Sequence, residues 1–188
     1  MKRRLLAILL TPLSAFGGER DLVNGIESVA GIYSSIFLHE AGHALAFKAV
    51  GATDISIEVP RAGSILSGVT TAQTSNPLSS SQRQFIAVSG LFTASLAAET
   101  VMQRRGLHSS VYAQSVLGTA VTSNLIHVYQ YYTRIRGVNG WAGNDIDQYE
   151  LAGGNPHVFS TVLAAYSLWT LSRMRKNEIP LFFVNLRF

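Results

Sequence analysis

Two histidines four residues apart, His39 and His43, form an HExxH pattern with the glutamate that follows the first of them, Glu40. If this stretch is helical, both histidines lie on one face, where their imidazole nitrogens can bind one metal ion with Glu40 beside it. A catalytic zinc ion also needs a further protein ligand and an open position for water. A neighbouring carboxylate can accept the proton of this water as the water attacks a carbonyl. The pattern therefore predicts a hydrolytic Zn2+ site in which Glu40 is the base.

The sequence around this pattern is too apolar for an ordinary water-exposed helix. Between Ser28 and Phe47, Glu40 is the only residue with a formal charge. HExxH also occurs by chance on solvated helices, but a carboxylate and two imidazoles in apolar surroundings are costly to leave unpaired. A bound cation satisfies all three groups, and this favours the metal site.

The composition indicates one domain in contact with lipid. The chain has 188 residues, of which 47% are hydrophobic and 14% charged, whereas about 25% are charged in a typical soluble domain. The net charge is +4, but the basic residues are scattered at the ends of apolar segments, as in membrane helices, so we expect no nucleic-acid partner. The absence of cysteines excludes disulfides, thiolate metal sites and cysteine nucleophiles.

Three regions follow from the order of apolar and polar segments. Residues 1–21 predict a signal-like or short N-terminal membrane segment, because a basic start is followed by an apolar run, 5–16, that is shorter than the roughly 20 residues of a spanning helix. Whether residues 1–17 are cleaved stays open. Residues 22–176 form the predicted metallopeptidase-like core, and residues 177–188 a strand-like tail with alternating apolar residues.

Within the core, the HExxH helix is expected at about 22–50, with Gly51 as its stop. Alternating β-branched residues at 53–74 predict a β-hairpin beside this helix. Apolar runs at 84–102 and 106–133 predict two further helices, and Asn155 and Pro156 begin a last one. The predicted fold is an all-α membrane helical bundle of about four core helices, with a small β-hairpin inserted after the HExxH helix.

Three acids compete to be the third metal ligand: Asp145, Asp147 and Glu99. An acid deep in an apolar run, such as Glu99, is a functional candidate because its burial needs a partner, yet nearby Arg104 can supply a salt link. Asp145 and Gln148 resemble a helix capping box, in which the acid caps backbone amides, and Asp147 would then lie in the first turn. From the residues alone the choice stays open.

Three motifs carry a resemblance to a known family: HEAGHALAFKAVGA, SGVTT after the hairpin, and NDIDQYELAGGNP before a tryptophan-bearing helix. Over about residues 30–172 the chain resembles the small, single-domain bacterial branch of the site-2-protease-like membrane zinc metallopeptidases. In that family an aspartate after the third core helix completes the site, and the matching residue here is Asp145. The resemblance implies an integral protein of the bacterial inner (cytoplasmic) membrane that cleaves membrane-anchored proteins or peptides.

The expectation is a zinc-dependent endopeptidase that acts in or near the bilayer. His39, His43 and Asp145 would bind Zn2+, and Glu40 would take the water proton and pass it to the leaving amine. The family's Gly-Pro-x-x-Asn element is replaced by Gly-Leu-Phe-Thr-Ala at 90–94, so a second hypothesis is a non-catalytic membrane scaffold with a relict zinc site. A third is a gluzincin-like peptidase with Glu99 as ligand. His127, in an apolar helix, is expected to be a hydrogen-bonded bundle histidine. Orientation and oligomeric state are not predicted.

Overall fold

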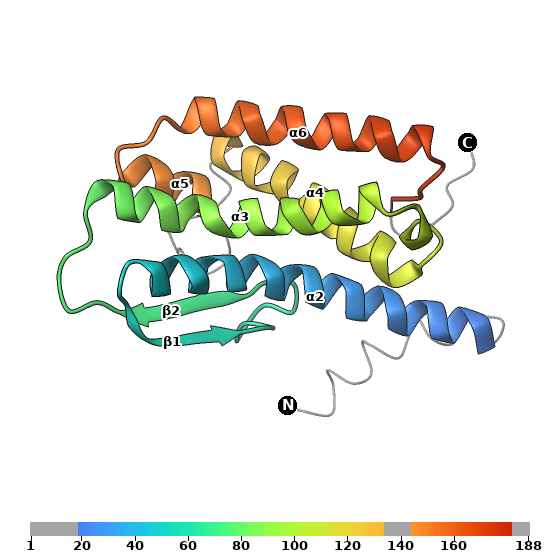
Figure 1. Ribbon diagram of the computed structural model, residues 1–188, viewed down its shortest axis with the longest axis horizontal. Coiled ribbons are helices and arrows are strands. Elements are labelled where there is room, and N and C mark those ends of the chain that lie inside the picture. Colours follow the sequence, from blue (N-terminus) through green and yellow to red (C-terminus); the bar gives the residue numbers. More distant parts are fainter. Residues whose placement is uncertain (1–18, 134–143, 182–188) are drawn as a thin grey trace.

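Helices dominate the computed structural model, which describes residues 19–133 and 144–181 (Figure 1). In chain order they are α2 (Glu19–Ala49), α3 (Ser80–Gln103), the short 3-10 turn η2 (Arg105–Leu107), α4 (Val111–Thr133), α5 (Asp145–Leu151) and α6 (Pro156–Lys176). Two strands, β1 (Thr53–Glu58) and β2 (Val69–Gln73), complete the described elements. The prediction of a mostly helical chain with a small β-hairpin after the HExxH helix is therefore confirmed.

Helix α2 extends further toward the N-terminus than predicted. It begins at Glu19, and residues 19–21, which the prediction assigns to the N-terminal segment, form its first turn. Acidic residues in a first turn interact favourably with the helix dipole, so this polar patch is compatible with a helix start. Residues 1–18, which contain most of the predicted signal-like segment, lie outside the described part of the chain.

The hairpin lies along the second half of α2 (Figure 1). Strands β1 and β2 are antiparallel, and Ser56 faces Thr71 while Glu58 faces Val69. Residues 59–68 connect the two strands. The start of β2 lies beside the HExxH turn of α2, where the Thr70 side chain contacts Glu40.

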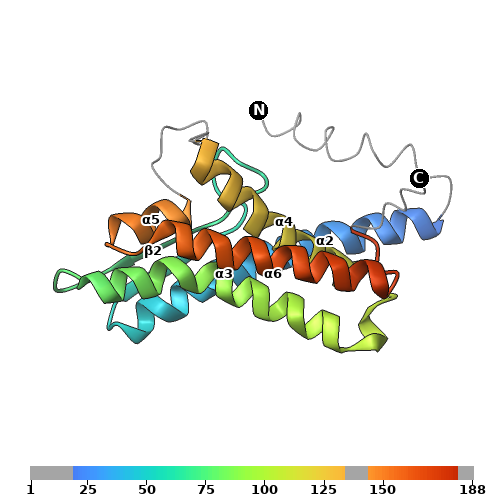
Figure 2. The ribbon, with the colours of Figure 1, turned by 90° about the horizontal axis from the view of Figure 1, so that it is seen from above.

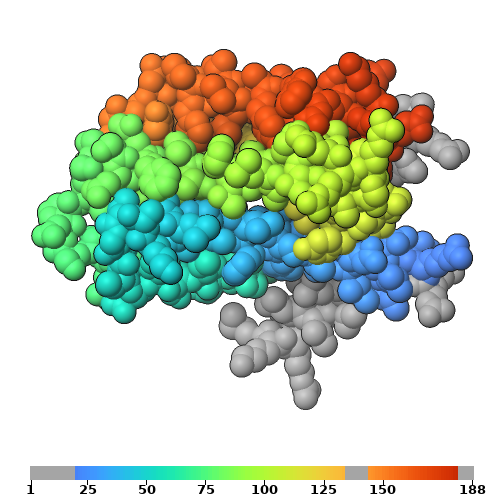
Figure 3. Space-filling model, in the orientation of Figure 1, coloured from blue at the N-terminus to red at the C-terminus, as the bar shows by residue number. Residues whose placement is uncertain are grey.

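Close contacts between α2 and α3 depend on small residues. A Cβ atom at Gly42 would collide with the backbone oxygen of Ser89 and with the side chain of Thr93. Glycine at this position allows the two backbones to approach, which is how helices pack closely in membranes. In two views α2, α3 and α6 run along the long axis of the molecule while α4 crosses obliquely between them (Figures 1 and 2). From one side, α2, α3 and α6 form parallel bands of surface (Figure 3).

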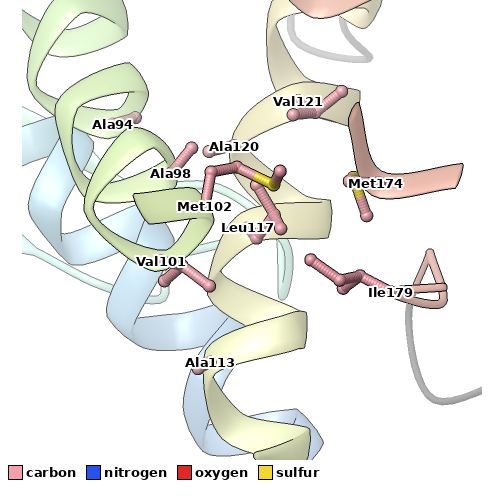
Figure 4. Close-up of a cluster of buried hydrophobic side chains, with 10 residues drawn as sticks. All are labelled: Ala94, Ala98, Val101, Met102, Ala113, Leu117, Ala120, Val121, Met174 and Ile179. Atoms are coloured by element: carbon pink, nitrogen blue, oxygen red, sulfur yellow. The ribbon is translucent and has the colours of Figure 1, made fainter. Parts of the chain in front are cut away.

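Two apolar clusters stabilise the bundle. The larger joins α3, α4 and the end of α6, with Leu117 and Ala98 fully buried between the helices (Figure 4). The smaller consists of Leu91, Tyr131, Ile146 and Leu163, and in it Ile146 of α5 has no exposed surface. Burial of one isoleucine side chain contributes about 1.5 to 3 kcal/mol, so this contact fixes the short helix α5 against α3, α4 and α6.

The outer faces of the long helices carry large apolar side chains. Exposed examples occur on every long helix: Ile26 and Leu45 on α2, Phe92 and Leu96 on α3, Ile126 and Tyr129 on α4, and Val162 and Leu168 on α6. Among the described residues, α3 alone is long and apolar enough to cross a membrane by its own composition, a test that a core helix of a soluble protein also passes.

The last helix begins as predicted and the tail differs in part from the prediction. Asn155 caps α6 through hydrogen bonds from the backbone N–H groups of His157 and Val158, and Pro156 is its first residue. Residues 177–181 form a turn and an irregular stretch rather than a strand, and Ile179 is buried in the larger cluster. The remaining residues of the predicted strand, 182–188, lie outside the described part of the chain.

Candidate metal centre

The two histidines of the HExxH turn point their outer nitrogens at one another. His39 Nε2 and His43 Nε2 are 3.1 Å apart, and the rings meet edge to face with centroids 4.8 Å apart. Nitrogens about 2.0 to 2.1 Å from a tetrahedral zinc ion lie about 3.3 Å from each other. The spacing of the two imidazoles therefore suits binding of one ion by both.

Asp145, at the first position of α5, supplies a carboxylate to the same place. Its Oδ2 lies 3.2 Å from His39 Nε2, and its Oδ1 lies 3.4 Å from His43 Nε2. These distances are again close to those between ligands of a tetrahedral ion. The structure thus brings together His39, His43 and Asp145, although more than a hundred residues separate the aspartate from the histidines.

The capping of α5 explains why Asp145 is available. Asn144 is the N-cap: its side-chain oxygen accepts hydrogen bonds from the N–H groups of Ile146 and Asp147. The Asp147 carboxylate in turn accepts from the Asn144 N–H at 3.4 Å, which completes the capping box. The predicted box of Asp145 with Gln148 is therefore wrong, because the preceding asparagine caps the helix. Asp145 is not needed for capping and faces the histidines.

The two other candidate acids have different surroundings. Asp147 is buried and accepts the Asn144 N–H, as described above. Glu99 makes two hydrogen bonds to Arg173 of α6, at 2.7 and 3.0 Å. Gly90 is the residue of α3 that lies against His39 and His43. Glu99 follows it by nine residues, which places Glu99 about 13 Å further along the helix axis. The salt partner expected for Glu99 exists, but it is Arg173 rather than Arg104.

The polar atoms of the centre lack the hydrogen bonds that burial usually requires. Asp145 Oδ2 and His39 Nδ1 are both buried, and neither makes a hydrogen bond among the described residues. Burial alone would raise the pKa of Asp145, but the adjacent imidazoles of His39 and His43 hold that pKa well below its usual range. An ionised carboxylate facing imidazole nitrogens in a site of this kind fits a divalent cation.

The ring orientation of His43 is fixed by a hydrogen bond at its second nitrogen, Nδ1. Its Nδ1–H donates to the backbone oxygen of Ile86 at 2.8 Å, so the lone pair of the neutral ring is on Nε2. Metal-binding histidines commonly donate their second N–H to a backbone carbonyl in this way. Helix α3 can pass this close only because Gly90 has no side chain, since a Cβ there would collide with His43 Nε2 and lie 2.8 Å from His39 Nε2.

Glu40 is 6% exposed and is held by the hairpin. The Thr70 hydroxyl lies 2.8 Å from Glu40 Oε2, to which it donates, and 2.9 Å from the Glu40 backbone oxygen. On its other side the carboxylate packs against Gly68, where an added Cβ would lie 2.9 Å from Oε1. Glu40, the base that the sequence predicts, is therefore held in place by residues of the SGVTT motif at the start of β2.

His127 of α4 also faces the centre, a role that the sequence reasoning did not assign to it. Its Nε2 lies 3.9 Å from Asp145 Oδ2, and its ring centroid is 5.7 Å from that of His39. Its Nδ1 donates to the Ser123 backbone oxygen at 2.8 Å, so the expected hydrogen bond within the bundle is present as well. One ligand atom each from His39, His127 and Asp145 lies within 4.8 Å of the others, and this group could hold a metal ion.

A cavity of about 1090 Å³ opens beside these residues. Its walls include the side chains of the candidate metal centre and Glu40, the connection and start of β2, and parts of α3, α4 and α5. Thr122 of α4 and residues of α5 line it, whereas the polar side chains of Gln114 and Asn124 do not. Gln114 donates to the His108 backbone oxygen, and Asn124 donates to the Ser95 hydroxyl.

Comparison of the chain with protein-family models, with curated proteins and with solved structures gives no match.

Proposed function

We propose that the protein is a zinc-dependent endopeptidase, related to the site-2-protease-like membrane metallopeptidases that its motifs resemble. The observation that carries the proposal is the position of Asp145, whose two oxygens lie 3.2 and 3.4 Å from the paired nitrogens of His39 and His43. A zinc ion bound there would polarise the scissile carbonyl and lower the pKa of a bound water toward 7. This is the donor set and the adjacent acid that metal-assisted hydrolysis requires.

The chain itself supplies the remaining steps of hydrolysis. Glu40 follows His39 directly and is therefore beside the metal position, where it would accept a proton from the attacking water. It would then deliver this proton to the amine of the leaving peptide. The Thr70 hydroxyl, which donates to Glu40 Oε2, restricts the carboxylate to one orientation. The cavity in front of these groups is large enough for a short extended peptide segment.

A bilayer as the site of action is supported by the surface and the composition. All four long helices expose large apolar side chains, and exposed apolar residues that gather into patches mark contact with a membrane or a partner. Only 14% of residues carry a charge. We propose that the chain is an integral protein of the bacterial inner membrane and that its substrates are membrane-anchored proteins or peptides.

The proposal is tested with detergent-purified protein and a pool of synthetic single-span transmembrane peptides, with cleavage read by mass spectrometry. We expect cleavage by the zinc-loaded wild type, and none after chelation or in Glu40→Gln. The Glu40→Gln variant should keep its zinc, because Glu40 is not a ligand. If wild type and Glu40→Gln give the same products, the assignment of Glu40 as base is wrong.

A second candidate function is a membrane scaffold that binds metal without catalysis. It is favoured by the sequence at 90–94, where α3 carries no asparagine that could stabilise a reaction intermediate. In this case the wild type would bind zinc, and its cleavage of the peptide pool would not differ from that of Glu40→Gln. The gluzincin-like hypothesis has less support, since Glu99 is already bound to Arg173.

A further inference from the structure

A neutral imidazole can carry its proton on either ring nitrogen, and the fold selects one of these tautomers for His127. Its Nδ1–H donates to the Ser123 backbone oxygen one helical turn earlier, at 2.8 Å. The proton of the neutral ring is therefore on Nδ1, and the Nε2 lone pair points away from α4. This lone pair faces Asp145 Oδ2, an oxygen that can only accept hydrogen bonds while it is ionised.

Two acceptors facing each other in a buried site repel unless a cation or a proton donor lies between them. His39 Nε2 and His43 Nε2 are 3.1 Å apart, which suits binding of one ion by both. Asp145 Oδ2 has no hydrogen bond among the described residues, although it lies near the imidazoles of both His39 and His127. One cation at the centre of the group would separate the two facing acceptors and bind the paired nitrogens as well.

The ring of His127 is held by the same kind of hydrogen bond as that of His43. In both residues Nδ1 donates to a backbone carbonyl at 2.8 Å, on Ser123 and Ile86 respectively. Such a bond fixes the ring of a metal ligand and raises its basicity. His127 Nε2 and Asp145 Oδ2 are 3.9 Å apart, somewhat wider than the about 3.3 Å between ligands of a tetrahedral zinc ion, so His127 would move a few tenths of an ångström inward on binding.

We propose that His127 is a fourth protein ligand of this centre, so that three histidines and one aspartate bind the same ion. The proposal extends the zinc site on which the proposed function rests, but it does not require that the protein cleave anything. Four protein ligands fill a tetrahedral zinc ion, so water could join only at five-coordination. A fourth ligand from α4 would also tie three helices, α2, α4 and α5, to one ion.

The decisive measurement is X-ray absorption spectroscopy of the purified, zinc-loaded protein, which counts imidazole ligands. We expect three in the wild type and two in His127→Gln, together with zinc binding at least about tenfold weaker by chelator competition. This magnitude is a lower bound, because loss of groups that only support a ligand already costs 10- to 100-fold. The matched control is His157→Gln, since His157 stacks on Tyr132 and touches none of the proposed ligands in the described structure.

Two imidazoles in the wild-type spectrum would overturn the proposal, with no variant needed. Equal zinc affinity of wild type and His127→Gln would also overturn it, and would indicate that water bridges His127 to the centre. Failure of the proposed function has a different signature. If the spectrum shows three imidazoles on zinc and the protein cleaves no transmembrane peptide, the four-ligand centre is supported and only the peptidase function is refuted.

Discussion

Substitution of Gly90 by alanine tests the geometry of the centre without removing any ligand. The added Cβ would lie 2.8 Å from His39 Nε2 and would collide with His43 Nε2, so both nitrogens must move by several tenths of an ångström. We expect zinc affinity to fall by about 10- to 100-fold, the cost of disturbing groups that orient ligands. This corresponds to about 1.4 to 2.7 kcal/mol of binding free energy.

The effect on folding should be the sum of two opposing contributions. Alanine is favoured over glycine inside a helix by about 1 kcal/mol, whereas overpacking a close contact costs about 1 to 3 kcal/mol. The metal-free variant should therefore be destabilised by about 0 to 2 kcal/mol. The assay is chelator competition for Zn2+ in detergent, with thermal unfolding of the metal-free protein as the measure of folding.

The matched control is Gly106→Ala in η2, where an added Cβ would meet no atom within 4 Å. This variant should bind zinc as the wild type does. If Gly90→Ala also binds zinc with wild-type affinity while folding normally, the paired nitrogens of His39 and His43 are not the metal ligands. The arrangement of α3 against α2 that we describe would then be wrong as well.

Three further predictions concern Glu40, the pH dependence of metal binding and Glu99. Thr70→Val should lower the turnover of a transmembrane peptide by about tenfold and leave its KM unchanged, while Thr70→Ser should restore turnover, because the hydroxyl that orients Glu40 is then retained; equal turnover of all three would refute the role of Thr70. Zinc affinity should fall as the pH drops below about 9, because burial lowers the pKa of His43 but the adjacent Asp145 carboxylate outweighs this and raises it to about 9, so that protons compete with zinc for this ring. The pKa of Asp145 is held well below its usual range, and a titration in which Zn2+ binding weakened only near the usual carboxyl pKa of about 4 would contradict this. Glu99→Gln should keep full zinc affinity and lower the free energy of unfolding by at most about 1 kcal/mol, since its ion pair with Arg173 is partly exposed; loss of zinc in this variant would instead favour the gluzincin-like hypothesis.

The helices and the hairpin were predictable because their signals are local. Apolar runs without charges, the alternation at 53–74 and the Asn155-Pro156 helix start each follow from a few neighbouring residues. Helix α2 begins three residues before the predicted start at about 22, because the acids among residues 19–21 are favourable in a first turn. Local patterns therefore give the elements and leave uncertainty of a few residues at their ends.

The composition of the centre was harder to predict, because it depends on which side chain of a short helix faces inward. Sequence alone left Asp145, Asp147 and Glu99 open. The decision rests on Asn144, whose side chain caps α5 and whose amide donates to the His127 backbone oxygen at 2.8 Å. No local pattern reports that tertiary contact. His127 was missed for a related reason, since a histidine in an apolar helix fits a bundle hydrogen bond and a ligand equally well.

The tertiary contacts of Asn144 also explain how a metal centre can form from segments so far apart in the sequence. Its amide joins α5 to α4, and Ile146 buries the first turn of α5 in the smaller apolar cluster. These two contacts place Asp145 opposite His39 and His43 without any help from a metal ion, because neither involves the carboxylate itself. Binding of a metal ion would then require little rearrangement, because contacts that do not involve the ligand atoms already hold Asp145 opposite the two histidines.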